Sequence, residues 1–98
     1  MVINYETKND KLTISLKGRL DTTTSPELEA FLAEHIGGTT LLVFDFTELE
    51  YVSSAGLRVI LSTQKTMSRQ GELVIRNVND TIMEVFEMTG FADILKIE

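Results

Sequence analysis

The chain has 98 residues, the size of one small domain, and we expect residues 1–98 to form a single domain without a second core. Its 15 acidic and 9 basic residues give a formal net charge of −6, which argues against direct nucleic-acid binding because lysine and arginine supply most of the affinity for phosphate backbones. The chain contains no cysteine and one histidine, His35, so disulfides, thiolate nucleophiles and multi-histidine metal sites are excluded, and we expect neither a metal nor a cofactor.

Nothing in the sequence predicts a membrane-bound or exported protein. No run of about 18 apolar residues is present, and we therefore expect no membrane span. Residues 1–6 lack the basic and apolar regions of a secretory signal. The sequence favours a cytoplasmic location.

The chain opens with a pattern typical of a β-hairpin. Apolar and polar residues alternate over residues 2–8 and 11–17, as in strands with one solvated face. Asn9-Asp10 between them has turn chemistry. Residues 18–21 (Gly-Arg-Leu-Asp) are expected to end the hairpin.

A helix is predicted next, and residues 37–38 (Gly-Gly) end it. Its apolar stripe has helical spacing and consists of Leu28, Phe31, Leu32 and Ile36. The sequence is consistent with two starts of this helix that differ by one residue. Pro26 suits a first helical turn capped by Ser25, whereas Thr24 and Glu27 have the spacing of a capping box.

Residues 40–46 are almost continuously apolar, which is typical of a strand covered on both faces. Residues 47–53 are expected to form a loop after it. Asp45 is the exception in the strand, because a buried carboxylate is costly unless it accepts hydrogen bonds. We therefore expect Asp45 to reach the backbone amides around residues 52–54 and to organise that loop.

The second half of the chain alternates helices and strands. A helix is predicted from residue 54 to Gly71, a strand over residues 72–76, a helix from residue 79 to Gly90, and a last strand over residues 94–97. The complete order is β-β-α-β-α-β-α-β. This order predicts an α/β fold with a mixed β-sheet, antiparallel in the opening hairpin and parallel from residue 40 onward.

Charge is unevenly distributed along the chain. Residues 1–50 hold nine acids and four bases, whereas the segment 54–70 holds Arg58, Lys65 and Arg69 and no acid. A basic helix face of this kind is either simply solvated or meets an acidic partner, and the sequence leaves both interpretations open.

Ser53 and Ser54 stand where the second helix begins. Serine is a favoured helix N-cap, which suits Ser53. A hydroxyl at a helix N-terminus also lies in the positive end of the macrodipole, where a phosphate would be tolerated. Gly56 in the first turn indicates either close packing against a strand or access for a partner.

Enzymatic motifs are absent from this segment. A hydrolase elbow requires G-x-S-x-G, and Val52 stands where its first glycine would be when the motif is centred on Ser54. His35 lies at the edge of the first helix's apolar stripe, a position typical of a structural histidine. Because no nucleotide-binding glycine motif is present either, we expect a binding protein rather than an enzyme.

Three motifs together resemble the STAS domains, the sulfate-transporter and anti-sigma-factor-antagonist domains of bacteria. They are Val43-Phe44-Asp45-Phe46 with residues 51–57 (Tyr-Val-Ser-Ser-Ala-Gly-Leu), residues 18–21 (Gly-Arg-Leu-Asp), and residues 86–91 (Phe-Glu-Met-Thr-Gly-Phe). Each is weak alone, but they follow in order with similar spacing over essentially the whole chain.

The resemblance implies an anti-sigma factor antagonist of the free-standing type. In that family the unphosphorylated domain sequesters an anti-sigma factor that is also a Ser/Thr kinase, which frees a sigma factor. The kinase then phosphorylates the serine that opens the second helix, and a Ser/Thr phosphatase reverses this. By position, the acceptor is Ser54. The residues implied for partner binding are Asp21, Thr22, Thr23, Val52, Ser53, Ala55, Gly56, Leu57 and Arg58.

Two departures from the family pattern keep alternatives open. Ser53 stands where the family has an aspartate, and Ala55 stands where it often has serine or threonine. Ser53 is therefore an alternative acceptor, and a constitutive domain that is never phosphorylated is a third possibility. The alternative function is a non-phosphorylated STAS binding module of a lipid-transport or other signalling complex.

Overall fold

The structure is a computed structural model that describes all residues, 1–98. Its strands are β1 (Val2–Lys8), β2 (Lys11–Leu20), β3 (Leu41–Val52), β4 (Glu72–Arg76) and β5 (Lys96–Ile97). Its helices are α1 (Ser25–His35), α2 (Ser54–Gln70) and α3 (Asp80–Thr89), with a short 3₁₀ helix, η1 (Phe91–Asp93), before β5. The predicted order of the main elements is confirmed.

The five strands form one mixed sheet in the order β1-β2-β3-β4-β5. β1 pairs antiparallel with β2, and each later neighbouring pair is parallel. The predicted fold class, an α/β fold with a mixed sheet, is confirmed. Because each parallel neighbour is reached through one helix and such crossovers are right-handed, α1, α2 and α3 lie on the same face of the sheet.

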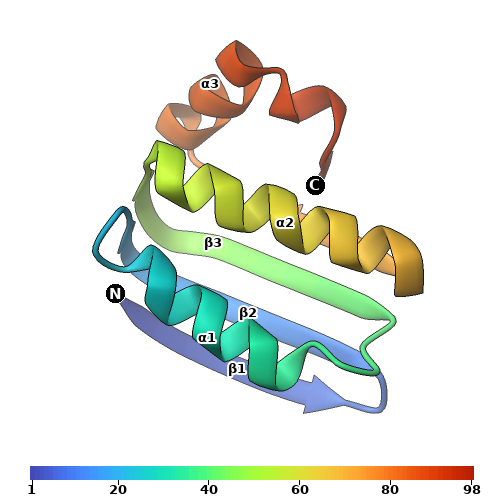
Figure 1. The fold of residues 1–98 in the computed structure, drawn as a ribbon. Helices are drawn as coiled ribbons and strands as arrows, with labels where there is room; N and C mark the ends of the chain where they lie inside the picture. Colours follow the sequence, from blue (N-terminus) through green and yellow to red (C-terminus); the bar gives the residue numbers. More distant parts are fainter.

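The core lies between that face and the helices (Figure 1), where α1 and α2 run side by side. A single cluster of 20 buried apolar residues joins β2, β3 and β4 to all three helices. Its largest fully buried side chains are Phe44, Phe46 and Phe86. One packed layer of helices on one sheet face therefore supports the whole domain.

Residues 40–46 are expected to form a strand covered on both faces, and the strand is buried on both faces at Leu42, Val43 and Phe44, but helices cover only one of them. Side chains alternate along β3, so Leu42 and Phe44 enter the helix-covered core, whereas Val43 points to the opposite face. Val43 and its neighbour Val74 are buried there without a helix. They lie in a shallow depression with long charged side chains, including those of Lys11 and Arg76, which cover apolar surface with their methylene groups.

β2 and β3 both extend further than the sequence predicted. The predicted loop over residues 47–53 is wrong, because residues 47–52 continue β3. They pair with the end of β2 from Lys17↔Glu48 to Leu20↔Val52. The pairing shifts register twice, once after Ser15 and once after Gly18. These bulges explain the wrong prediction, because they break the apolar alternation that identifies a strand.

The helix starts settle the alternatives that the sequence left open. The N-cap of α1 is Thr24, and its side chain makes no cap hydrogen bond, so neither Ser25 as cap nor the Thr24–Glu27 capping box forms. The caps of α2 and α3 are Ser53 and Asn79, whose side chains accept from Gly56 and Ile82 amides. β5 is shorter than the predicted 94–97, because η1 and its C-terminal turn extend to residue 95.

No helix in the structure is both long enough and apolar enough to cross a bilayer.

Candidate functional site

Two loops meet at one end of the sheet, where β2 and β3 both finish. The backbone N–H of Ser53 donates to the carbonyl of Leu20 at 2.9 Å. This bond joins the last residue of β2 to the residue that caps α2. We call the polar residues on these two segments, Asp21, Thr22, Thr23, Ser53 and Ser54, the two-loop surface.

Asp21 organises the first loop through its carboxylate. Its Oδ1 accepts from the backbone N–H groups of Thr23 at 3.0 Å and Thr24 at 3.1 Å. These hydrogen bonds hold the pKa of Asp21 below its usual value of 3.8, and the bond from the Thr24 amide contributes most. The Thr24 hydroxyl donates to the carbonyl of Arg19 at 2.8 Å and accepts from the Asp21 amide at 2.9 Å. The loop is therefore tied down at both ends.

Arg19 connects this loop to β3. Its guanidinium carbon lies 4.4 Å from the centre of the Tyr51 ring, a cation–π contact. Its Nε lies 3.7 Å from Asp21 Oδ2. Sequence reasoning gave roles to neither Arg19 nor Tyr51. No sequence signal reveals this contact, because the parallel pairing that places the two residues opposite each other follows two register shifts.

Ser53 and Ser54 occupy different environments. Ser53 is the N-cap of α2, and its Oγ accepts from the Gly56 amide at 3.3 Å. Ser54 is the first residue of the helix and is exposed. Its hydroxyl takes part in none of the side-chain hydrogen bonds within the chain, so the Ser54 oxygen is accessible and unengaged.

Gly56 lies where the helix touches the sheet. A Cβ at this position would sit 2.8 Å from Leu20 Cγ, 2.9 Å from the Leu20 carbonyl oxygen and 3.0 Å from Val52 Cγ1. Real Cβ contacts do not approach this closely, so a side chain here would push α2 away from the strand ends. Close packing therefore accounts for this glycine.

The residues implied for partner binding separate into a surface group and a supporting group. Thr22, Thr23, Ser54 and Arg58 are exposed, and Asp21, Ser53 and Ala55 are partly exposed. Val52, Gly56 and Leu57 are buried. The buried three cannot contact a partner in this conformation, and their place in the structure is to hold the surface group in position.

Known proteins resemble this chain over nearly its whole length. The model of the STAS domain matches residues 2–98. The chain belongs to the STAS domain family. It is 35% identical to the protein BtrV of Bordetella bronchiseptica, over 99% of this chain and 85% of that protein. It is 34% identical to the anti-sigma-B factor antagonist of Listeria monocytogenes, over 95% of this chain and 83% of that protein.

Solved structures of anti-sigma factor antagonists share the fold. An anti-sigma factor antagonist of Mycobacterium paratuberculosis superposes with a TM-score of 0.88 at 18% identity, covering 98% of this chain and 83% of that one. The Bacillus cell fate determinant SpoIIAA in its phosphorylated form has a TM-score of 0.77 at 21% identity, covering 99% and 91%. Relatives of this kind are binding proteins rather than enzymes.

Asp45 does not belong to the two-loop surface of this STAS domain, and the expectation that it reaches the amides of residues 52–54 is wrong. Its Oδ1 accepts from the Thr47 hydroxyl at 2.5 Å, the Thr47 amide at 3.0 Å and Asn77 Nδ2 at 3.1 Å. These bonds, that from the Thr47 hydroxyl first, lower the pKa of Asp45. Because β3 continues to Val52, Ser53 lies a further eight residues along an extended strand.

A row of basic residues runs along the exposed face of α2 in the STAS domain. Arg58, Lys65 and Arg69 are 7 and 4 residues apart, and this spacing places them on one side of a helix. All three are exposed, and none is within ion-pair distance of a carboxylate. Ser54, four residues before Arg58, begins the same row.

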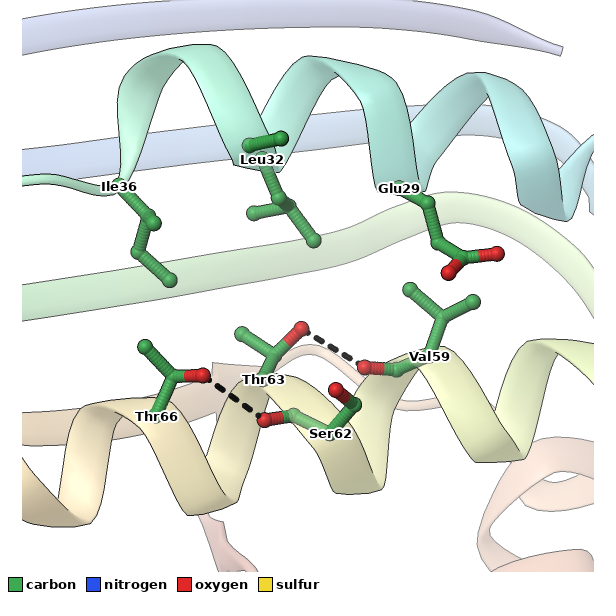
Figure 2. A pocket seen from close by; sticks show the side chains of 8 residues that line it. Glu29, Leu32, Ile36, Val59, Ser62, Thr63 and Thr66 are labelled. Carbon is green, nitrogen blue, oxygen red and sulfur yellow. Dashed lines mark hydrogen bonds between the residues drawn. The ribbon is translucent and has the colours of Figure 1, made fainter.

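A groove between α1 and α2 continues from the two-loop surface along the STAS domain. Its first part has a volume of about 390 Å³ and is lined by residues that include Thr22, Ser25, Ala55 and Arg58. Figure 2 shows its second part, where Glu29 and Leu32 from α1 and Ile36, the C-cap of α1, face α2. The facing residues of α2 are Val59, Thr63 and Thr66. The groove brings Thr22 of the first loop to the same edge as Arg58.

Proposed function

We propose that this STAS domain is an anti-sigma factor antagonist and that phosphorylation of Ser54 controls its binding. Its partner in this proposal is an anti-sigma factor with Ser/Thr kinase activity, and a Ser/Thr phosphatase reverses the modification. The names of its relatives in Listeria and Staphylococcus, anti-sigma-B factor antagonist, support the role. The SpoIIAA structure in a phosphorylated form supports a phosphate on a domain of this fold.

The observation that carries the proposal is the free, exposed hydroxyl of Ser54 at the first position of α2. A kinase must bring this oxygen into line with the γ-phosphorus of ATP, which requires a hydroxyl that is accessible and not already used. Ser53 satisfies neither condition as well, because it is partly buried and its oxygen caps the helix. The geometry therefore favours Ser54 over Ser53 as acceptor.

The transfer is a simple exchange of oxygen partners on phosphorus. A bond forms between Ser54 Oγ and the γ-phosphorus of ATP, and the bond between that phosphorus and the β,γ-bridging oxygen breaks, which releases ADP. The hydroxyl proton passes to a base of the kinase. This chain supplies only the hydroxyl and its presentation at the helix end.

Phosphorylation is expected to release the partner without unfolding the domain. A phosphate carries about −1.5 to −2 charges at neutral pH, and a helix N-terminus stabilises negative charge. The first turn of α2 should therefore remain intact. Release then follows from the bulk and charge of the phosphate within the partner's contact area.

The experiment is to incubate the protein with ATP and each anti-sigma factor kinase of the same genome, and to map phosphate by mass spectrometry. The proposal expects one phosphate on Ser54 from one kinase and none on the Ser54→Ala variant. Ser53→Ala is the matched control and should still be modified. An unmodified chain that binds a partner tightly under all conditions would instead indicate a constitutive binding module.

A further inference from the structure

The first turns of α2 contain an arginine, Arg58, that forms no ion pair with any other residue of the chain. Arg58 is exposed and takes part in none of the three ion pairs of the structure, whereas Arg19, Lys17 and Lys96 each have a carboxylate partner. Arg58 lines the groove that also contains Glu29, but the two do not form an ion pair. The guanidinium group is therefore available to another anion.

Arg58 stands four residues after Ser54 on the same face of α2. Side chains at positions i and i+4 of a helix are neighbours, with Cβ atoms about 5–6 Å apart. The arrangement with the anion on the N-terminal side and the cation on the C-terminal side is the favourable one. A phosphate on Ser54 would therefore be within reach of the guanidinium, which binds phosphate through two parallel hydrogen bonds.

Other hydrogen-bond donors near Ser54 are also unused. The Ser53 hydroxyl accepts from the Gly56 amide, and the Ser53 carbonyl accepts from the Leu57 amide. The backbone N–H groups of Ser54 and Ala55, at the start of the helix, have no partner within it. In the same groove as Arg58, the Ser25 hydroxyl is buried and has no hydrogen-bond partner. The site thus presents several unused donors and one cation, and the carboxylate that lines the same groove, Glu29, is not paired with that cation.

We propose that Arg58 receives the phosphate group of phosphorylated Ser54 and pairs with it within the same helix. The inference rests on the proposed function and deepens it. Before phosphorylation, Arg58 offers a free positive charge to the partner. Afterwards, that charge is bound to the phosphate, so the helix end changes from about +1 to about −1. The switch then withdraws an attractive charge in addition to adding a repulsive one.

The pairing is specific to Ser54. A phosphate on Ser53 would have Leu57 at the corresponding position, a buried apolar residue. The next bases of the row are too distant to replace Arg58, because Lys65 lies 11 residues after Ser54, about 16 Å along the helix axis. Lys65→Gln is therefore a matched control that removes the same charge from the same face.

The test uses full-length chains with phosphoserine installed at position 54 by semisynthesis, in wild-type, Arg58→Gln and Lys65→Gln backgrounds. Phosphorus NMR titration reports the second pKa of the phosphate, and thermal unfolding of each chain is compared with its unphosphorylated form. We expect the phosphate pKa to be about 0.3 lower in the wild type than in Arg58→Gln. The phosphate should also raise the melting temperature about 2 °C more in the wild type.

Lys65→Gln should behave like the wild type in both measurements. Equal values for wild type and Arg58→Gln, or an equal change in Lys65→Gln, would overturn the pairing. Because the phosphate is installed without a kinase, this outcome is distinct from failure of the proposed function, which is an absence of kinase-dependent phosphate on Ser54.

Discussion

The backbone N–H of Ser53 and the carbonyl of Leu20 form a 2.9 Å hydrogen bond that ties the start of α2 to the end of β2. The same Leu20 carbonyl lies against Gly56, the fourth residue after Val52. One residue of β2 thus fixes both the cap of α2 and the depth at which its first turn packs. Ser54 stands between these two contacts, so its position relative to Asp21 is set by the core.

The first prediction concerns that packing. Gly56→Ala should lower the free energy of unfolding by about 1 kcal/mol, because overpacking against Leu20 and Val52 costs about 1–3 kcal/mol and the better helix propensity of alanine returns about 1 kcal/mol. Urea unfolding measures the difference. Gly37→Ala is the control, since a Cβ at Gly37 has no atom within 4 Å. A Gly56→Ala variant as stable as the wild type would show that the contact is not tight.

The second prediction separates the two serines by stability alone. Ser53→Ala should cost about 0.5–1 kcal/mol, because the hydroxyl caps α2. Ser54→Ala should change the free energy of unfolding by less than about 0.5 kcal/mol, because the Ser54 side chain is exposed and unbonded. Ser53→Asn, which can still cap, should retain most of the stability. Equal costs for Ser53→Ala and Ser54→Ala in urea unfolding would contradict this assignment.

The elements with strong local signals could be predicted from the sequence. The apolar stripes of α1 and α2, the Asn9-Asp10 turn and the glycines at residues 71 and 90 gave the order of elements, and the order gave the mixed sheet. The helix start at Ser54 was also predictable, because the polar pair Ser53-Ser54 follows an apolar strand.

What could not be predicted depends on contacts between distant residues. β3 continues through Thr47 because β2 offers it a partner across two bulges, and no local pattern reveals a bulge. The prediction for Asp45 fails with it, because the continued strand carries residues 52–54 away, and Asp45 instead accepts from Thr47, two residues on, and from Asn77, 32 residues away in sequence. Thr24 is the N-cap of α1 by its backbone position only, because its hydroxyl donates to the Arg19 carbonyl. This bond depends on the tertiary structure, so the sequence pattern does not predict it.

The third prediction uses the lowered pKa of Asp45. A carboxyl whose pKa is lower in the folded state stabilises the fold above its unfolded pKa of about 3.9, and this contribution is lost as the pH falls through the folded pKa. Asp45→Asn should therefore reduce stability at pH 7 by about 1 kcal/mol and flatten the loss of stability below about pH 4. Urea unfolding at pH 7, 5, 4 and 3 measures this, with Asp93→Asn as control. A parallel loss in wild type and Asp45→Asn would refute the role of the Thr47 and Asn77 bonds.

The last prediction concerns the kinase identified by phosphate mapping and the basic row of α2. Ser54→Ala should bind this partner at least as tightly as the unphosphorylated wild type. Ser54→Asp should bind at least about tenfold more weakly, because a buried like charge or an unpaired charge at an interface costs more than about 1.4 kcal/mol.

Charge reversal at Lys65 and Arg69, which lie further along the basic row of α2, should change the rate of association with the kinase. It should slow association and flatten its dependence on salt while leaving dissociation nearly unchanged, since charges at the rim of an interface mainly steer the encounter. Stopped-flow association at several salt concentrations separates the two effects. If Ser54→Asp and Ser54→Ala bind alike, control of binding lies elsewhere on the domain, and if reversal at Lys65 and Arg69 leaves association unchanged, that part of the row is simply a solvated helix face.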